Sequence, residues 1–132
     1  YAVIAGDGTF KPVTLLAGDK SHREDKQIFS EQTVLKMRQI LQAPVARGTA
    51  KRAFCKDVAV AGKTGTARRL DKDGQYEQVY NSFFAGFFPA DNPRYVIAVY
   101  ADDPKEQYYG GVICAPLVGE IAKSLMQLPE LD

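Results

Sequence analysis

The spacing of apolar residues in the first third of the chain predicts one well-defined helix. Apolar side chains recur every three or four positions over residues 34–41, with charged residues between them, which is typical of a helix with one buried face. Ser30 is a favoured N-cap residue, and Glu31 places a negative charge where the helix dipole stabilises it. Pro44 disfavours helical backbone at the residue before it, so we expect this helix to end near Ala43.

Runs of β-branched, aromatic and small apolar residues in the second half of the chain predict three strands. They cover Val58–Leu70, Tyr76–Phe88 and Tyr95–Ala101. Asp71-Lys72-Asp73-Gly74 contains an Asp-Gly pair, which is a strong hairpin signal, and Pro89–Pro93 predicts a second turn. The third strand is apolar on both faces, which favours a central position in its sheet.

The remaining stretches of the first half predict short or irregular elements. Tyr1–Ala5 is interpreted as the last turn of a helix, which Gly6 would cap in the left-handed conformation. We expect an extended piece over Phe10–Leu16, a polar loop over Ala17–Gln27, and a loop or broken helix over Val45–Lys56. The basic residues of that last stretch could form an anion site, although a solvated loop is the simpler interpretation.

A final helix is predicted over Pro116–Leu128, after a loop over Asp102–Gly111. Proline suits the first turn of a helix, where a missing N–H leaves no hydrogen bond unmade. An apolar stripe on this helix is expected to lie on the sheet, and it consists of Leu117, Ile121, Leu125 and Leu128. Together these elements predict an α+β fold, a three-stranded antiparallel meander packed with helices.

Composition and charge exclude several classes of function. The chain has 132 residues, 45% of them apolar, with 17 basic and 16 acidic side chains and a formal net charge of +1. That balance argues against a general nucleic-acid binder, and no apolar run approaches the ~20 residues of a membrane span. We interpret residues 1–132 as a single partial domain, because the chain opens on the apolar tetrad Tyr1-Ala2-Val3-Ile4 with no cap before it.

The sequence offers no set of side chains with the spacing needed to bind a metal ion or a cofactor. His22 is the only histidine, and it lies in a polar run that is typical of a solvated loop. Cys55 and Cys114 are far apart and do not have the spacing of a metal site. A disulfide between them would require an oxidising compartment and a short Cα–Cα distance, so their pairing stays open. We therefore expect neither a metal ion nor a cofactor.

The tripeptide Gly62-Lys63-Thr64 invites comparison with a phosphate-binding loop, but its surroundings disagree. The motif requires a glycine five positions before Gly62, and that position is Asp57, whose carboxylate would face the phosphates. Val58–Ala61 are strand formers where the loop needs flexible backbone with free N–H groups. A nucleotide-binding protein of this class is therefore only a remote alternative.

The same residues suit a strand beside a catalytic cleft. Lys63 offers a positive charge that can hold a substrate carboxylate and influence proton transfer near a nucleophilic serine. Thr64 and Thr66 add hydroxyls, Gly65 lets a peptide approach the backbone, and the Thr66 N–H could donate to a developing oxyanion. Strict alternation places Lys63 and Thr64 on opposite faces of a strand, so both reach one cleft only if the strand is twisted and lies at the sheet edge.

Four stretches resemble the class B penicillin-binding proteins, the division-type peptidoglycan transpeptidases. Ala61–Ala67 resembles their K-T-G box, and Gly48–Ala53 resembles the G-T-x-K-x-A run that precedes it. Phe84–Ala90 is similar to their next strand and turn, and Tyr108–Gly111, followed by Ala115-Pro116, is similar to the loop and helix start of the septal enzymes. The resemblance covers nearly the whole chain.

The resemblance implies the carboxy-terminal portion of a transpeptidase fold shared with the serine β-lactamases. The expected activity is D,D-transpeptidation of peptidoglycan stem peptides ending in D-Ala-D-Ala, through an acyl-serine intermediate that β-lactams also form. Lys63 would be the catalytic residue, and the substrate-binding residues would be Thr64, Gly65, Thr66, Tyr108, Tyr109, Gly110 and Gly111. Cell-division proteins, including a glycosyltransferase, are expected partners, and the expected location is the periplasmic side of the bacterial inner membrane, with the anchor outside this chain.

Two further boxes of the family are missing from this sequence. It contains neither an S-x-x-K nor an S-x-N motif, so we expect the nucleophile before Tyr1 and a chain that is inactive alone. The resemblance also implies that a strand from that missing part lies against Tyr95–Ala101. We therefore expect this chain to leave that edge unpaired, or to pair it with another copy or a second chain. The alternative is a non-catalytic binding module that kept the sheet and lost the nucleophile.

Overall fold

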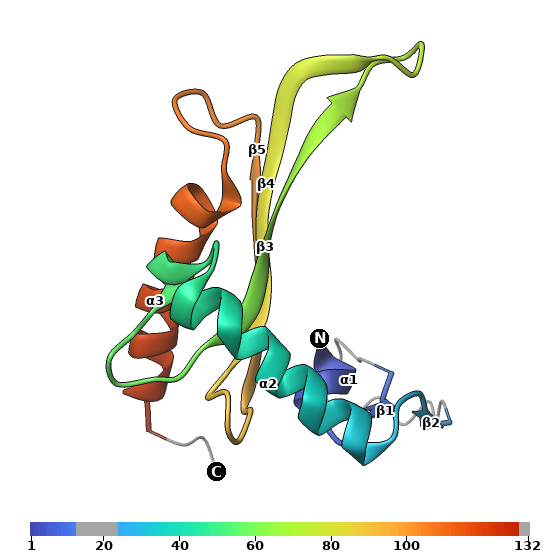
Figure 1. Ribbon diagram of the computed structural model, residues 1–132, viewed down its shortest axis with the longest axis vertical. Helices are drawn as coiled ribbons and strands as arrows, with labels where there is room; N and C mark the ends of the chain where they lie inside the picture. The colour runs from blue at the N-terminus through green and yellow to red at the C-terminus, as the bar shows by residue number, and fades with distance from the viewer. Residues whose placement is uncertain (13–23, 130–132) are drawn as a thin grey trace.

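A three-stranded antiparallel sheet of order β3-β4-β5 organises the computed structural model, which describes residues 1–12 and 24–129 (Figure 1). The strands are β3 (Ala61–Leu70), β4 (Tyr76–Phe88) and β5 (Tyr95–Asp102). The predicted meander is confirmed, although β3 begins at Ala61 rather than at Val58. His22 lies outside the described residues.

The β3–β4 hairpin projects beyond the end of β5 and away from the helices (Figure 1). Its tip is the predicted Asp-Gly turn, in which the Asp71 carboxylate accepts from the backbone N–H groups of Asp73 at 2.9 Å and Gln75 at 2.7 Å. Gly74 adopts a φ of +78°, a conformation that glycine tolerates without strain. This turn chemistry sets the register that aligns β3 with β4.

The predicted helix after Ser30 forms, but it runs further than expected. The Ser30 hydroxyl accepts from the Thr33 N–H at 3.3 Å, and α2 spans Glu31–Arg47 with Pro44 inside it. The predicted end near Ala43 is therefore wrong. Continuing the helix buries Val45 in the core at 4% exposure, and this burial offsets the hydrogen bond that proline cannot make.

The last helix also begins earlier than predicted, and a different face of it is buried. Helix α3 spans Gly110–Met126, so Pro116 is in its interior rather than in its first turn. Its buried face is made of small residues, Gly110, Cys114, Ala115, Val118, Gly119 and Ala122, whereas Leu117 and Ile121 of the predicted stripe are exposed. The short helix η1 (Lys51–Ala53) explains this difference, because it packs directly against α3 and leaves room only for small side chains. A Cβ on Gly119 would lie 3.2 Å from the Ala53 carbonyl oxygen of η1.

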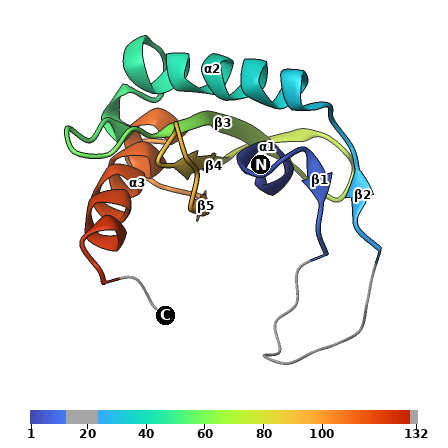
Figure 2. The same cartoon turned by 90° about the horizontal axis from the view of Figure 1, so that it is seen from below.

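The sheet separates two apolar clusters. Figure 2 shows α3 on one side of the sheet, α1 (Ala2–Ala5) on the other, and α2 above β3. Phe84 and Phe88 belong to the cluster on the α3 side, while Phe87 packs with Leu41 of α2 on the opposite side. Successive strand residues face opposite sides of a sheet. Strand β4 therefore anchors both clusters, and all three of these phenylalanines are fully buried.

Strand β5 lies at an edge of this sheet, so the prediction of a central position is wrong for the described chain. Within residues 1–12 and 24–129, β5 pairs only with β4, which is the open edge that the family resemblance predicts. Val96 and Tyr100 on its outer face are 49% and 61% exposed. The inner face of β5, with Ile97 and Val99, packs against the cluster on the α3 side. Only the apolar side chains of the outer face stay largely exposed within the described residues.

The N-terminal segment packs as a small separate layer against α2. The Arg38 guanidinium donates to the carbonyl oxygens of Ile4 and Ala5, both at 2.8 Å, and so ties α1 to α2. Gly6 has a φ of −91°, not the predicted left-handed conformation, and it is Gly8 that has a positive φ of +92°.

Two short strands form a further sheet in this segment. Strand β1 (Thr9–Phe10) pairs with β2 (Lys26–Gln27). The predicted loop over Ala17–Gln27 is therefore wrong at its end, where backbone groups of Lys26 and Gln27 pair with β1.

Cys55 and Cys114 are free thiols, and burial raises the pKa of the Cys114 thiol. Over the ranges described, no helix combines the length and the hydropathy that crossing a bilayer requires.

Candidate active site

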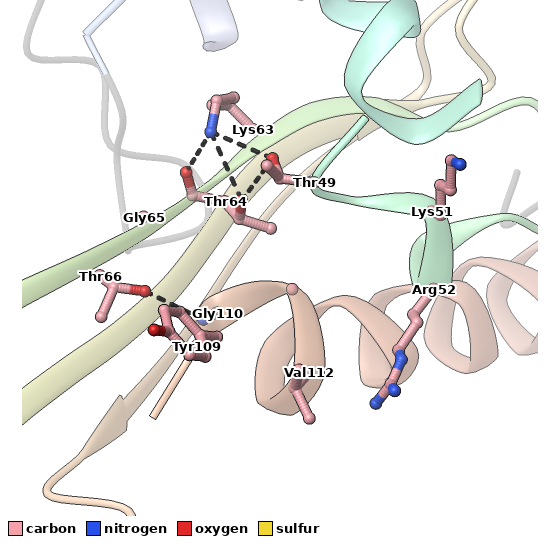
Figure 3. A pocket seen from close by; sticks show the side chains of 11 residues that line it. Thr49, Lys51, Arg52, Lys63, Thr64, Gly65, Thr66, Tyr109, Gly110 and Val112 are labelled. Carbon is pink, nitrogen blue, oxygen red and sulfur yellow. Dashed lines mark hydrogen bonds between the residues drawn. The ribbon is translucent and has the colours of Figure 1, made fainter. Parts of the chain in front are cut away.

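A pocket of about 460 Å³ lies where β3, the segment between α2 and η1, and the first turn of α3 meet (Figure 3). Its lining residues are Thr49, Lys51, Arg52, Lys63, Thr64, Gly65, Thr66, Tyr109, Gly110, Gly111 and Val112. The structure thus gathers at one pocket nearly all the residues that the sequence indicates, from segments far apart in the chain.

Lys63 places its ammonium group among oxygen atoms at this pocket. Its Nζ donates to the Thr64 carbonyl oxygen at 2.8 Å and to the Thr49 hydroxyl at 3.3 Å, and lies 3.4 Å from the Thr64 hydroxyl. The long lysine stem bends along the edge strand, so Lys63 and Thr64 both reach the pocket despite the alternation of the strand. The side chains of Lys51 and Arg52 point away from Lys63 in Figure 3, so Lys63 provides the cation at this cluster.

Threonine hydroxyls surround that ammonium group. The Thr64 hydroxyl donates to the Thr49 hydroxyl at 2.9 Å. The Thr66 hydroxyl accepts from the Gly110 N–H at 3.2 Å, which leaves its own proton for a ligand. One positive charge and several hydroxyls at one rim form a receptor for a carboxylate.

Glycines allow the walls of the pocket to approach each other. A Cβ on Gly110 would lie 2.5 Å from the carbonyl oxygens of Gly65 and Phe83, and one on Gly111 would lie 2.2 Å from the Thr49 carbonyl oxygen. Both glycines belong to the first turn of α3 rather than to the predicted loop. A Cβ on Gly65 would lie 2.0 Å from the Phe83 ring, so packing across the ladder also requires a glycine there.

The two adjacent tyrosines occupy different positions. Tyr109 is 56% exposed and lines the pocket, whereas Tyr108 does not line it. The Tyr108 ring instead stacks on Tyr80, with centroids 4.1 Å apart, and its carbonyl oxygen accepts from the Ser82 hydroxyl. The hydrogen bond of the Tyr108 phenol to Tyr109, at 3.4 Å, raises the pKa of Tyr108, so this phenol stays neutral at physiological pH.

Thr49 and Val112 are pocket residues that the sequence interpretation did not select. Thr49 lies in the G-T-x-K-x-A run, so a signal for it was present in the sequence. Lys51 and Arg52 belong to the same run and to the basic stretch interpreted as a solvated loop or an anion site, and both line the pocket. Val112 has no distinctive signal, because its position follows only from the early start of α3.

The phosphate-loop alternative is wrong. Gly62, Lys63 and Thr64 lie within β3 and are opposite Gly86, Ala85 and Phe84 of β4. A phosphate-binding loop requires a strand, a flexible loop and then a helix. The next element here is the second strand of a hairpin.

Comparison with known proteins gives a consistent family. Residues 1–127 match the model of the penicillin-binding protein transpeptidase domain. The chain is 44% identical over 108 residues to stage V sporulation protein D of Bacillus subtilis, covering 80% of this chain and 16% of that protein. It is 31% identical over 136 residues to the peptidoglycan D,D-transpeptidase FtsI of Escherichia coli K12, covering 100% of this chain and 23% of that protein.

Solved structures agree with the sequence relatives. Penicillin-binding protein 3 of Mycobacterium tuberculosis, in its apo form, matches with a TM-score of 0.80 and 37% identity, covering 95% of this chain and 32% of that chain. The same protein complexed with ampicillin matches with a TM-score of 0.80 and 34% identity over 95% of this chain and 32% of that chain. The family model, the named relatives and the shared fold show that this chain belongs to the transpeptidase-domain family of the class B penicillin-binding proteins.

Proposed function

We propose that this chain supplies the K-T-G wall of the active site of a peptidoglycan D,D-transpeptidase. The chain spans 16% and 23% of the two curated relatives described above, so the activity belongs to the longer protein. The observation that carries the proposal is the Lys63 ammonium, held among the hydroxyls of Thr49 and Thr64 at the rim of a pocket. Two of the relatives described above, a peptidoglycan D,D-transpeptidase and a penicillin-binding protein, support it.

The stem peptide ends in a free carboxylate, which is the group that this rim is built to hold. The Lys63 ammonium and the Thr66 hydroxyl would donate to the D-Ala carboxylate. Hydrogen bonds to charged groups contribute about 1.5–3 kcal/mol each. A β-lactam carries a carboxylate in an equivalent place, and the complexes of the Mycobacterium tuberculosis relative with ampicillin and aztreonam support β-lactams as ligands.

The strand itself orients the peptide. Strand β3 is at the edge of the described sheet, so an extended stem peptide can pair with it as an added strand. The Thr66 N–H would then donate to the oxyanion that develops on the carbonyl of the penultimate D-Ala.

The attacking atom would come from the part of the protein that precedes Tyr1. A serine Oγ bonds to the carbonyl carbon of the penultimate D-Ala, the C–N bond breaks, and the terminal D-Ala leaves as an amine after taking up a proton. The amine of a second stem peptide then displaces the serine and forms the cross-link. A β-lactam opens its ring in the first step and stays attached, because no leaving group departs.

The location and partners of the protein follow from this substrate. Peptidoglycan is cross-linked outside the cytoplasmic membrane, so we place the domain on the periplasmic side of the inner membrane, with an anchor outside this chain. We expect a glycosyltransferase that polymerises the glycan strand, together with other cell-division proteins, as partners. The FtsI name of the Escherichia coli relative supports the division role.

Labelling with a fluorescent penicillin tests the proposal. The full-length protein is expected to carry one covalent label per molecule, and the isolated 132-residue chain is expected to stay unlabelled, because it has no S-x-x-K motif. Heat-denatured full-length protein is the control for non-specific attachment. A folded full-length protein that never labels would instead favour the non-catalytic binding module.

A further inference from the structure

We infer that a second cavity, a basic groove lined by Arg52, Lys56 and Lys123, binds the carboxylate end of the second stem peptide, which is the acyl acceptor. The inference rests on the proposed function and adds to it a place for the second substrate. The groove has a volume of about 350 Å³ and lies between η1, the segment that follows η1, and helix α3.

One residue connects this groove to the active-site pocket. Arg52 lines both cavities, and its side chain points away from Lys63 (Figure 3). The pocket includes the first turn of α3 up to Val112, and the groove lies further along the same helix, from Pro116 to Lys123. A ligand that extends past Arg52 therefore passes from the pocket into the groove.

The second chemical step decides from which side the acceptor enters. The amine nitrogen of the acceptor bonds to the carbonyl carbon of the acyl-serine, the C–O bond to the serine breaks, and a proton of the amine returns to the serine oxygen. This step is the reverse of acylation with a different amine. The incoming nitrogen therefore approaches from the side on which the first D-Ala departs.

The direction of the bound donor peptide places that side near η1. The proposed function assigns its carboxylate to Lys63 and its reacting carbonyl to the Thr66 N–H, so the donor runs from the β3–β4 hairpin toward the beginning of β3. The segment of Thr49, whose hydroxyl the Lys63 ammonium contacts at 3.3 Å, bounds the space beyond the carboxyl end of the donor. That segment continues directly into η1 and Arg52.

The groove carries positive charge that the described residues do not neutralise. Among these residues, Arg52, Lys56 and Lys123 take part in no ion pair, and all three are exposed. Residues 47–56 contain four of the 17 basic residues of the chain and no acid, whereas the rest of the chain has 13 basic and 16 acidic side chains. This local excess attracts an anionic group.

The other residues of the groove favour a peptide over a denser anion. Asp57 and Glu120 also line it, so a polyanion such as a nucleic acid is repelled, whereas a peptide offers one terminal carboxylate to the cations and N–H groups to the acids. Phe54 is 67% exposed at the groove. Pro116 and Gly119 of α3 have no long side chain, which leaves room for a peptide backbone. A stem peptide that ends in D-Ala-D-Ala has each of these features.

The test measures transpeptidation by the full-length protein with two acceptors. A D-alanyl thioester is the donor, and the acceptor is a stem peptide with a free side-chain amine that ends either in a carboxylate or in an amide. Lys56→Met and Lys123→Met are combined in one variant. The matched control combines Lys26→Met and Lys36→Met, which remove two exposed charges outside both cavities.

The groove variant is expected to raise the KM for the carboxylate acceptor about 5- to 20-fold, because two cations that face the carboxylate are lost. The KM for the amide acceptor should change less than about threefold. The control variant should keep both values within about twofold of the wild type. Acylation by benzylpenicillin, which uses no acceptor, is measured alongside to detect a change in the fold.

Other outcomes would overturn the inference. Equal rises with the two acceptors, or a parallel loss of penicillin acylation, would mean that the two lysines only support the fold. The same rise in the control variant would mean that the acceptor responds to total charge. An unchanged KM in a protein that penicillin still acylates would remove the groove from the reaction and leave the proposed function intact. A wild-type protein that penicillin does not acylate would overturn the proposed function, and this inference with it.

Discussion

Replacing Lys63 by methionine in the full-length protein is expected to lower the rate of acylation by penicillin about 100- to 10,000-fold. Methionine keeps most of the length of the side chain and removes its charge. Among the described residues, Lys63 is the cation in the Thr49–Thr64 cluster, so the substrate carboxylate would lose that partner. Proton transfer near the nucleophile would also lose the electrostatic influence of the ammonium group. The second-order rate constant with a fluorescent penicillin is the measurement.

Lys51→Met is the matched control for this experiment. Lys51 lines the same pocket, but its side chain points away from Lys63 (Figure 3). Exposed charges that make no direct contact with the ligand contribute little to its binding. We therefore expect the acylation rate constant of Lys51→Met to change less than about threefold. Equal losses in Lys51→Met and Lys63→Met would show that the pocket responds to total charge, and would contradict the specific role given to Lys63.

Replacing Gly110 by alanine is expected to destabilise the domain by about 3 kcal/mol. The added Cβ would lie 2.5 Å from two backbone carbonyl oxygens, those of Gly65 and Phe83, and neither can rotate away. The first turn of α3 must therefore move from β3, and the Gly110 N–H must leave the Thr66 hydroxyl. Denaturant unfolding measures the stability, and penicillin labelling measures the effect on the site.

Gly119→Ala is the control, because Gly119 is a buried glycine of the same helix. Its added Cβ would lie 3.2 Å from the Ala53 carbonyl oxygen, which is tight but not overlapping. Alanine also favours helix by about 1 kcal/mol over glycine, so the net change should stay within about 1 kcal/mol. If Gly110→Ala were no more destabilising than Gly119→Ala, the close contact of α3 with β3 would be contradicted.

The strands were predictable because their signals are local. The aromatic content of Tyr76–Phe88 predicts β4 with its observed bounds, and the Asp-Gly pair predicts the hairpin turn. The helices were less predictable, because proline rules describe an isolated helix. Pro44 and Pro116 both lie inside helices whose continuation buries other residues, Val45 in α2 and Cys114 in α3, and that burial depends on tertiary contacts.

The residues of the site also differ in whether local sequence or tertiary contacts bring them together. Lys63, Thr64 and Thr66 are adjacent in the sequence, so their chemistry was visible as a group. The G-T-x-K-x-A run marks Thr49 in the sequence, but its position beside Lys63 follows from the turn after α2, which brings it back to β3. The prediction that the apolar stripe of the last helix is buried was wrong for a related reason. Small residues such as Gly119 are buried wherever two backbones approach closely.

The most direct test of the central claim is to locate the acyl bond. The full-length protein would be treated with benzylpenicillin, digested and analysed by mass spectrometry. We predict a single penicilloyl adduct, on a serine of an S-x-x-K motif before Tyr1, and its loss in Lys63→Met at short reaction times. An adduct on a serine within residues 1–132, or no adduct on the folded protein, would contradict the claim that this chain forms the K-T-G wall of a transpeptidase.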